Sequence, residues 1–308
     1  MNELDLTKIE DIELELTTLC NASCPLCYRN YKVFKEHYPK RIIRDIIDIK
    51  NDIDKFPNLK YIKLVGTISE PTLYPNFLEL IEYIKSKDLE IEICTNGDTN
   101  NQNDGIWWKK LGELLSINDQ VFFSICGSTQ ELHKIYRKGT SLQNILRNAK
   151  QLRSEKPIDF AQCIRFQYND NDFNSNTFKE LIKEFSNIYW TETYLRKPNE
   201  NYNNQNNLNK LYPLDSKKDN YLKVENLATK IYQTKKTLNC MKCMAYENKS
   251  LQIDINGNIY PCYLFLEASN GKLWDKNWEP ILNGKYEVCK FCHKNIKALT
   301  EKEMHYII

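Results

Sequence analysis

The amino-acid sequence predicts an α/β protein: a partial, TIM-like (β/α)6 barrel followed by a small cysteine-rich α+β domain. Strand-like and helix-like patterns alternate through roughly the first two hundred residues, which favours a parallel sheet with helical crossovers. An Asn-rich segment at 197–210 ends this alternation, and five cysteines and a hairpin signal follow it. We therefore expect a barrel over residues 1–196, a linker and helix over 197–236, and a small domain over 237–308.

The predicted strands are short segments rich in β-branched and aromatic residues or in alternating apolar residues. They are Glu13–Thr18, Lys60–Gly66, Glu90–Thr95, Gln120–Cys126, Asp159–Tyr168 and Ile188–Leu195. Six β–α units are too few for a complete eight-unit barrel. Ligand sites in parallel α/β folds lie at the carboxyl ends of the strands, so we expect the site residues there.

Periodic apolar residues predict the helices between these strands. The segments are Arg41–Phe56, Pro75–Lys87, Ser141–Leu152 and Asn176–Phe185, and a further helix opens at Trp107 and Trp108. Near the C-terminus, LQIDINGNIYPC predicts a hairpin in which Asn256 and Gly257 form a two-residue turn with positive φ at both positions.

Composition excludes several functional classes. The 308 residues carry 43 Lys and Arg against 41 Asp and Glu, so a nucleic-acid partner is not expected. No apolar run approaches the about 20 residues of a membrane span, and the mean hydropathy is −0.62. The acidic N-terminus resembles neither a signal nor a transit peptide, so we expect a cytoplasmic protein without a membrane partner.

Three cysteines with C-x3-C-x2-C spacing, Cys20, Cys24 and Cys27, directly follow the first predicted strand. Without an export signal, metal ligands are a better interpretation than disulfides. Three thiolates on one loop can hold three irons of a 4Fe–4S cluster and leave the fourth iron open. Zinc also accepts thiolates, although structural zinc sites usually have four ligands. The loop lies where barrel enzymes keep their active sites, which favours the cluster.

The chain resembles the radical S-adenosylmethionine (SAM) superfamily over roughly residues 10–195. After the cysteine trio, GTISEPTLYP (Gly66–Pro75) is similar to the family's Gly-Gly-Glu-Pro motif. CTNG (Cys94–Gly97) is similar to its Ser-Thr-Asn-Gly motif, and SICGSTQELHKIYRKG (Ser124–Gly139) to its fourth-strand segment. Four motifs in order on consecutive strands make the resemblance specific.

The resemblance implies a site residue by residue. Cys20, Cys24 and Cys27 would bind the 4Fe–4S cluster whose open iron chelates SAM. The implied SAM contacts are Thr67, Ser69 and Glu70 for the methionyl ammonium, Thr95 and Asn96 in the cofactor groove, and Ser124 and Arg137 on the ribose and carboxylate side.

This sequence departs from the family pattern at three positions. Ser69 replaces the usual second Gly before Glu70, Cys126 stands where Asp is common, and Leu26 replaces an aromatic residue within the trio. We expect a less permissive backbone at Ser69, an altered ribose contact at Cys126, and adenine packing on an aliphatic surface at Leu26.

A second group of cysteines resembles the Twitch/SPASM extension of radical SAM enzymes, with its motif C-x9–15-G-x4-C. The resemblance implies one auxiliary 4Fe–4S cluster on Cys243, Cys262, Cys289 and Cys292. The alternative is a zinc ribbon using Cys240, Cys243, Cys289 and Cys292, because two C-x2-C pairs are a common zinc pattern. With the cluster, Cys240 is left as a structural thiol, an alternative ligand, or the hydrogen-atom donor of an epimerase.

The resemblance also implies a reaction: reductive cleavage of SAM to a 5′-deoxyadenosyl radical, which abstracts a hydrogen atom from a substrate. An external flavodoxin or ferredoxin would supply the electron. We expect an oxidoreductase that dehydrogenates a sugar, an aminocyclitol or a nucleotide-linked small molecule. Epimerisation and peptide maturation are alternatives, although nineteen residues before Cys20 leave no room for a leader-binding domain. A non-catalytic iron–sulfur or zinc scaffold is a further alternative.

Overall fold

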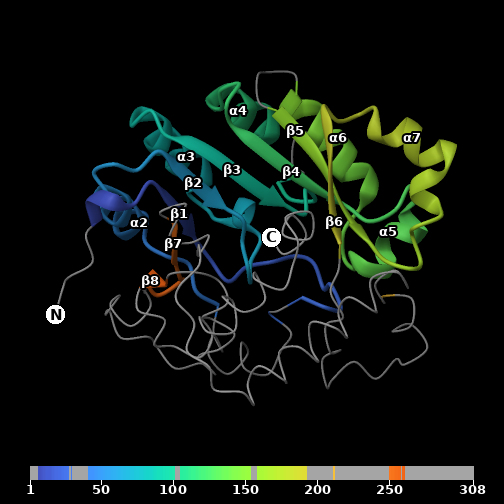
Figure 1. Ribbon diagram of the computed structural model, residues 1–308, viewed down its shortest axis with the longest axis horizontal. Helices are drawn as coiled ribbons and strands as arrows, with labels where there is room; N and C mark the ends of the chain where they lie inside the picture. The colour runs from blue at the N-terminus through green and yellow to red at the C-terminus, as the bar shows by residue number, and fades with distance from the viewer. Residues whose placement is uncertain are drawn as a thin grey trace, which may run out of the picture.

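The computed structural model describes residues 6–27, 29, 41–100, 105–153, 158–192, 211, 250–257 and 259–260. In these ranges, strands and helices alternate, and most of the helices lie along one side of a single sheet (Figure 1). The strands are β1 (Asp11–Leu14), β2 (Tyr61–Leu64), β3 (Glu90–Thr95), β4 (Gln120–Ile125), β5 (Ile158–Arg165), β6 (Asn187–Glu192), β7 (Ser250–Ile253) and β8 (Ile259–Tyr260).

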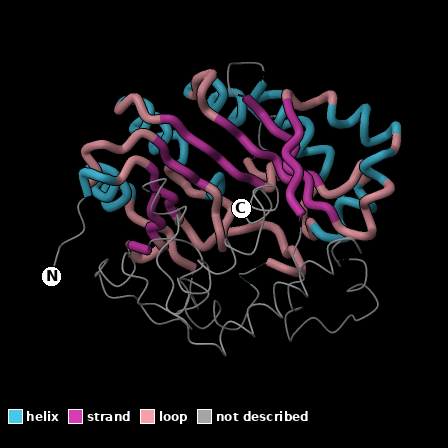
Figure 2. Tube along the Cα trace, in the orientation of Figure 1, coloured by secondary structure: helices cyan, strands magenta, loops and turns pink. Residues whose placement is uncertain are grey.

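The sheet has the order β6-β5-β4-β3-β2-β1-β7-β8. β1 to β6 pair in parallel in chain order, β7 adds to the free side of β1 in parallel, and β8 pairs antiparallel with β7. Figure 2 shows this arrangement, with the strands in magenta and helices in cyan along their outer side. The predicted α/β fold class with a partial (β/α)6 barrel is confirmed.

Six α-helices connect the strands of the described chain, together with short 3-10 turns. The helices are α2 (Ile46–Asp54), α3 (Phe77–Ser86), α4 (Ile106–Leu114), α5 (Gln130–Tyr136), α6 (Leu142–Arg153) and α7 (Asn176–Ile182). Side-chain oxygens cap the N-termini of α2, α5 and α7. Asp45, Thr129 and Ser175 accept hydrogen bonds there from backbone N–H groups of the first turn. The 3-10 turns are η1 (Leu6–Lys8), η3 (Pro71–Leu73) and η5 (Asp172–Asn174).

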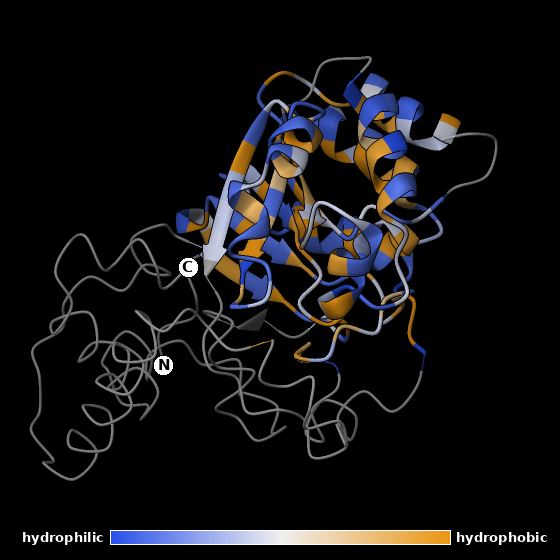
Figure 3. Ribbon diagram, turned by 90° about the vertical axis from the view of Figure 1, so that its right-hand side faces the viewer, coloured by the Kyte–Doolittle hydropathy of each residue, from blue (hydrophilic) through white to orange (hydrophobic). Residues whose placement is uncertain are grey.

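The hydrophobic core lies between the helices and the sheet. α3 contributes Phe77, Leu80, Ile81 and Ile84, and α4 contributes Trp108, whose side chain is fully buried. Figure 3 shows hydrophobic segments in orange on the strands, while the helices carry both colours. Burial of these apolar stripes holds the helices in place and leaves the opposite face of the sheet free for chemistry.

The opposite face of the sheet is polar over β1 to β3. On β1, Ile12 and Leu14 are buried against the helices, whereas Asp11 and Glu13 alternate with them and face the barrel interior. The same alternation holds on β2 and β3. On β4 to β6 the interior carries aromatic rings, with Phe122 stacked on Phe160 at 4.6 Å between ring centroids.

Most predicted elements are confirmed within a few residues at their ends. The strand predicted over Glu13–Thr18 shares only Glu13 and Leu14 with β1, and two further elements differ in their details. The helix expected over Arg41–Phe56 begins only at Ile46, because Asp45 caps it and Ile43 bridges to Thr17. The hairpin of β7 and β8 is present, but five residues separate the paired Ile253 and Ile259. Gly257 adopts positive φ (78°) and Asn256 does not, so the predicted two-residue turn is wrong.

Other expectations concern parts of the chain that the structure does not describe. The domain limits at 196 and 236 and the helix expected near 221–235 lie outside the described residues, and they stay predictions. Among the helices described, none combines the length and apolar character needed to cross a bilayer.

Candidate functional site

The three cysteines of the trio lie on the loop that leaves β1. Cys24 is buried (6% exposed), Cys20 and Cys27 are partly exposed, and all three are free thiols. The loop turns back on itself through a hydrogen bond from the Cys27 N–H to the Cys24 carbonyl (3.1 Å). The sequence therefore places three unpaired sulfurs on one turn, at the carboxyl end of a barrel strand.

Hydrogen bonds fasten this loop to the ends of three other strands. The Glu70 N–H donates to the carbonyl of Leu19 (2.7 Å) at the end of β2. Asn21 accepts from the Asn96 side chain (2.8 Å) and donates to the carbonyl of Asp98 (2.6 Å), both at the end of β3. The Ser23 N–H donates to the carbonyl of Lys138 (2.8 Å) after β4. The cysteine loop and the three segments that resemble SAM-binding motifs thus form one connected site.

Glu70 organises the centre of this site from a buried position (2% exposed). Its carboxylate accepts hydrogen bonds from the hydroxyls of Thr72 (2.7 Å) and Thr95 (2.6 Å) and from the Asn96 N–H (2.6 Å). It also caps η3 by accepting from the Thr72 N–H (3.3 Å). These contacts give Glu70 a role in positioning Thr95 and Asn96, and its contact with the methionyl ammonium stays a prediction.

Thr67 and Ser69 lie on the turn after β2, where they contact two glutamates of β1 and its extension. The Thr67 hydroxyl donates to Glu13 (3.0 Å), and the Ser69 hydroxyl donates to Glu15 (2.9 Å). Gly66 makes this turn possible, because its φ is +61° and a Cβ there would lie 2.6 Å from the Ser69 carbonyl oxygen. Ser69, at the position where the family usually has glycine, therefore adds a side-chain bond that holds the turn to Glu15.

Glu15 is a site residue that the motifs did not single out. Its side chain is 6% exposed, and it accepts from the Ile68 N–H (3.1 Å) as well as from Ser69. Burial, reinforced by the charge of Glu13 and opposed by these hydrogen bonds, raises the pKa of Glu15 to about 7. This carboxyl group should change its charge near neutral pH.

Glu15→Gln is expected to reduce the pH dependence of stability. The pKa of Glu15 is 4.5 when unfolded and about 7 when folded, so below pH 4.5 both states are protonated. As the pH rises from 4.5 to 7, the unfolded chain releases its proton first, and the free energy of unfolding falls. The loss above pH 7 is about 3 kcal/mol, which the Gln variant should avoid.

Urea unfolding of the full-length apoprotein at pH 5 and pH 8 measures this effect. The matched control is Glu79→Gln, which removes an exposed carboxylate paired with Lys50 and should follow the wild type. An equal pH dependence in Glu15→Gln and in the wild type would contradict the assignment.

Arg137 lies directly behind the cysteine loop. Its Nη1 atom is 3.8 Å from Cys24 Sγ, and its guanidinium lies 5.3 Å from the centre of the Tyr136 ring. Although burial opposes its charge, the sulfurs of Cys24 and Cys126 raise the pKa of Arg137. A permanent positive charge therefore lies beside the trio, and it could pair with a carboxylate ligand.

His133 holds the segment that carries Arg137. Its Nδ1 accepts from the Cys126 N–H (3.3 Å), and its Nε2 lies 2.9 Å from the Thr140 hydroxyl, which donates to the Arg137 carbonyl (2.8 Å). Burial, with Arg137 nearby, lowers the pKa of His133 to about 3. The neutral ring is thus a fixed connection between the end of β4 and the turn after α5.

Ser124 and Cys126 lie on the interior face of β4 and at its end. The Ser124 hydroxyl donates to Gln162 of β5 (3.5 Å). Cys126 is fully buried among Cys24, Leu26, Tyr136 and Phe166. Leu26 thus packs beneath the cysteine loop as an aliphatic side chain, and the SAM contacts expected of Ser124, Thr95, Asn96 and Arg137 stay predictions.

The residues of the trio fit an iron–sulfur cluster. Burial, followed by the charge of Glu70, raises the pKa of the Cys20 thiol to about 11, and burial and Cys24 raise the pKa of Cys27. Burial thus disfavours the thiolate at Cys20 and Cys27, and the positive charge of bound iron would favour it. Within the described ranges, no three His, Cys, Asp or Glu side chains converge on a single-ion site. A cubic cluster instead spreads its three cysteines over three irons.

The auxiliary site stays a prediction. Cys240, Cys243, Cys262, Cys289 and Cys292 all lie outside the described residues. Tyr189 and Trp190 of β6 lie on the two opposite faces of the sheet. Tyr189 packs edge-on against Phe122 in the interior (5.4 Å), whereas Trp190 packs on Phe173 (5.1 Å) on the helix side.

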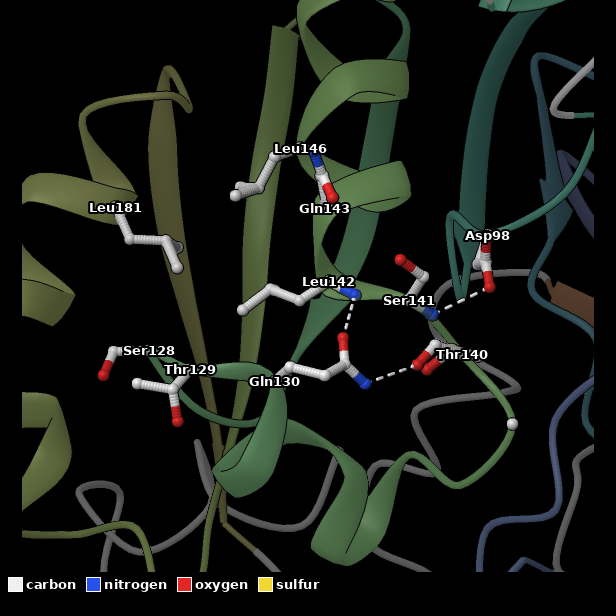
Figure 4. Close-up of a pocket in the computed structure, with 11 residues that line it drawn as sticks. Asp98, Ser128, Thr129, Gln130, Thr140, Ser141, Leu142, Gln143, Leu146 and Leu181 are labelled. Atoms are coloured by element: carbon white, nitrogen blue, oxygen red, sulfur yellow. Dashed lines mark hydrogen bonds between the residues drawn. The ribbon is translucent and has the colours of Figure 1, made fainter.

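A surface pocket of about 580 Å³ opens beside the site, among α5, α6 and α7 (Figure 4). Several of its polar groups are already paired with one another. Asp98 accepts from the Ser141 N–H (2.8 Å), and Gln130 bonds to the Leu142 N–H (2.7 Å) and the Thr140 carbonyl (2.9 Å). These bonds stabilise the segment after α5, and we assign the pocket no ligand.

Comparison with protein families agrees with this geometry. The model of the radical SAM superfamily matches residues 14–173. The chain is also 32% identical over 117 residues to the tungsten-containing aldehyde ferredoxin oxidoreductase cofactor-modifying protein of Pyrococcus furiosus. That match covers 36% of this chain and 29% of the relative, so the chain matches less than a third of that protein's length.

Solved structures share the fold. SuiB of Streptococcus suis, bound to its precursor peptide SuiA, gives a TM-score of 0.56 at 13% identity and covers 96% of this chain and 74% of SuiB. Native anSMEcpe with bound AdoMet and the Cp18Cys peptide gives a TM-score of 0.56 at 18% identity, with 91% of this chain and 83% of that chain covered. At these identities the likeness concerns architecture.

Proposed function

Because the chain belongs to the radical SAM superfamily, we propose that it is a SAM-cleaving oxidoreductase whose 4Fe–4S cluster is bound by Cys20, Cys24 and Cys27. The observation that carries the proposal is the connection of the cysteine loop to the ends of β2, β3 and β4. In this arrangement the cysteine loop carries the three thiols, Arg137 lies beside Cys24, and the Glu70 N–H bonds to the same loop.

When bound, the cluster supplies the electron that divides SAM into methionine and a 5′-deoxyadenosyl radical. The residues of the chain bind and orient SAM. The guanidinium of Arg137 can donate two parallel hydrogen bonds to the carboxylate of SAM. Glu70 holds Thr95 and Asn96 in place through bonds of 2.6 Å, so that the groove they line does not need to reorganise on binding.

The overall reaction that we propose is the removal of two hydrogens from a small molecule. One hydrogen atom passes from the substrate carbon to the 5′-deoxyadenosyl radical. The substrate radical then loses one proton and one electron and becomes a carbonyl or imine. We propose that Cys243, Cys262, Cys289 and Cys292 would hold an auxiliary 4Fe–4S cluster, which would supply an acceptor for that electron. A flavodoxin or ferredoxin would supply the first electron.

Iron analysis tests the two-cluster proposal. Seven thiolates, three plus four, should hold about eight iron and eight sulfide per chain after anaerobic reconstitution. The Cys20→Ala/Cys24→Ala/Cys27→Ala variant should retain about four of each. About four iron together with one tightly bound zinc in the wild type would favour a zinc ribbon in the C-terminal region.

Product mass tests the reaction. We expect Cys240→Ala to keep its full iron content and its turnover, and to give a product two hydrogens lighter than the substrate. An epimerase needs a thiol that returns a hydrogen atom. A product of unchanged mass that takes up solvent deuterium, together with loss of turnover in Cys240→Ala, would show that the reaction is an epimerisation and not a dehydrogenation.

A further inference from the structure

An acidic row crosses the interior of the barrel below the cysteine loop. The row consists of Gln252, Glu13, Lys63, Glu92 and Gln120, which are successive partners in the register of β7, β1, β2, β3 and β4. These strands lie side by side in Figure 1. Glu92 lies three residues before Thr95, which is about 10 Å along the strand toward the barrel floor. At Glu92 the row is thus deeper than the loops that form the SAM site, and at Glu13 it meets them, because the Thr67 hydroxyl donates to Glu13 (3.0 Å).

Negative charge exceeds positive charge in this part of the interior. Asp11, Glu13, Glu15 and Glu92 alternate with the core residues of β1 and β3, and Lys63 is the basic residue of the same face within the described strands. Lys63 pairs with Asp11 at 2.7 Å. Lys63 makes its ion pair with Asp11, and its charge also acts on Glu13 and Glu92 without an ion pair to either. One cation thus faces three carboxylates among the described residues of this face.

The remaining polar groups of the row present acceptors. Gln252 is 7% exposed and bonds to Glu13, and its Oε1 atom has no hydrogen-bond partner within the described chain. Glu92 accepts from the Tyr61 hydroxyl (3.3 Å) and from the Cys94 thiol (3.7 Å) through one oxygen each. Each carboxylate oxygen can accept a further bond. Burial of unpaired acceptors is costly, so a ligand that carries only donors would be stabilised here.

The opposite wall of the interior is aromatic. Phe122 and Phe160 stack at 4.6 Å, and Tyr189, which is 40% exposed, contacts Phe122 edge-on at 5.4 Å. Phe122 is also the register partner of Cys94, next to Glu92 on β3. An apolar or ring-shaped body can pack on this wall while its charged end reaches the acidic row.

We propose that Glu13, Glu92 and Gln252 bind an ammonium group of the substrate. An alkylammonium carries three donors, no acceptor and one positive charge, which complements two carboxylates and one free amide oxygen. This inference rests on the proposed function, because it makes the barrel interior the substrate site. Within the substrates considered above it selects amine-bearing molecules such as aminocyclitols, and it disfavours nucleotide-linked ones, whose phosphates would be repelled.

Direct binding tests the proposal on the full-length, reconstituted protein with SAM and without reductant. The charged probes are 2-deoxystreptamine and N-acetyl-lysine N-methylamide, and the neutral probe is the Nε-acetyl analogue of the lysine derivative. Binding of each probe is measured by ligand-observed NMR titration. We expect both amines to bind at least about tenfold more tightly than the neutral analogue, a difference of about 1.4 kcal/mol. Tighter binding of the aminocyclitol would indicate a small-molecule substrate, and tighter binding of the lysine probe a peptide.

Variants then locate the binding. Glu13→Gln and Glu92→Gln keep hydrogen-bonding side chains but remove charge, and each should weaken amine binding about tenfold. Glu90→Gln, at the exposed start of β3, should have no effect. Lys63→Met removes the competing cation and should tighten binding, an effect that misfolding does not produce. SAM affinity should be unchanged in Glu92→Gln; a parallel loss would show that the row balances the charge of SAM instead.

Equal binding of charged and neutral probes, or unchanged amine binding in Glu13→Gln and Glu92→Gln, would overturn the ammonium site. The proposed function is judged separately, by 5′-deoxyadenosine formation from SAM and dithionite. If the wild type cleaves SAM and binds no amine, only the ammonium site fails. If it binds amines and never cleaves SAM, only the proposed function fails.

Discussion

Replacing any one of Cys20, Cys24 and Cys27 by Ala is expected to abolish the production of 5′-deoxyadenosine from SAM and dithionite. A cluster that keeps one iron open for SAM needs all three thiolates, and no other described cysteine lies on this loop. The fold should survive. Even for Cys24, the most buried of the three, the lost packing is expected to cost about 1 kcal/mol.

The matched control is Cys163→Ala, which removes a fully buried thiol from the helix side of β5. It should lose similar stability and keep SAM cleavage. Chromatography of anaerobic reactions measures 5′-deoxyadenosine, and urea unfolding confirms that each variant is folded. Cleavage of SAM by the triple Ala variant would exclude the radical SAM assignment for this site.

The fold could be predicted largely from the sequence, because β–α alternation produces strong local patterns. The strand predicted over Glu90–Thr95 is observed with the same limits. Errors concentrate where a tertiary contact decides the end of an element. At Asp45 the side chain caps α2, which begins at Ile46, five residues after the predicted start at Arg41. Among the described residues of the hairpin loop, Gly257 carries a positive φ and Asn256 does not.

The site could be predicted only in part. Motifs identified the cysteines, Glu70 and Arg137, but the bond between Asn21 and Asn96 joins residues 75 positions apart, and no local pattern indicates it. Alternation marks Glu13 and Glu15 as residues on the face opposite the core, which on an open sheet would be solvent. In the barrel the same face is interior, so these carboxylates become buried and the pKa of Glu15 rises.

Glu70→Ala is expected to lower the free energy of unfolding by about 3 kcal/mol and to impair SAM binding. The substitution removes the acceptor for the N–H groups of Asn96 and Thr72 and for two hydroxyls. The hydroxyls can turn to other acceptors, but each buried N–H left unpaired costs about 1–3 kcal/mol. With Asn96 no longer held, the contact to Asn21 should loosen, and the affinity for SAM should fall about tenfold.

Glu70→Gln separates the positioning role from a direct charge contact with SAM. The amide keeps one acceptor oxygen but turns its NH2 group toward either the Asn96 N–H or the Thr95 hydroxyl, so the stability loss should be intermediate. Glu79→Gln, which changes an exposed carboxylate of α3, serves as the control for both variants. SAM affinity is measured by titration at a temperature where each variant is folded. If affinity follows the stability loss, Glu70 acts by positioning Thr95 and Asn96; full loss of affinity in Glu70→Gln with near-native stability would instead show that its negative charge meets the ammonium of SAM.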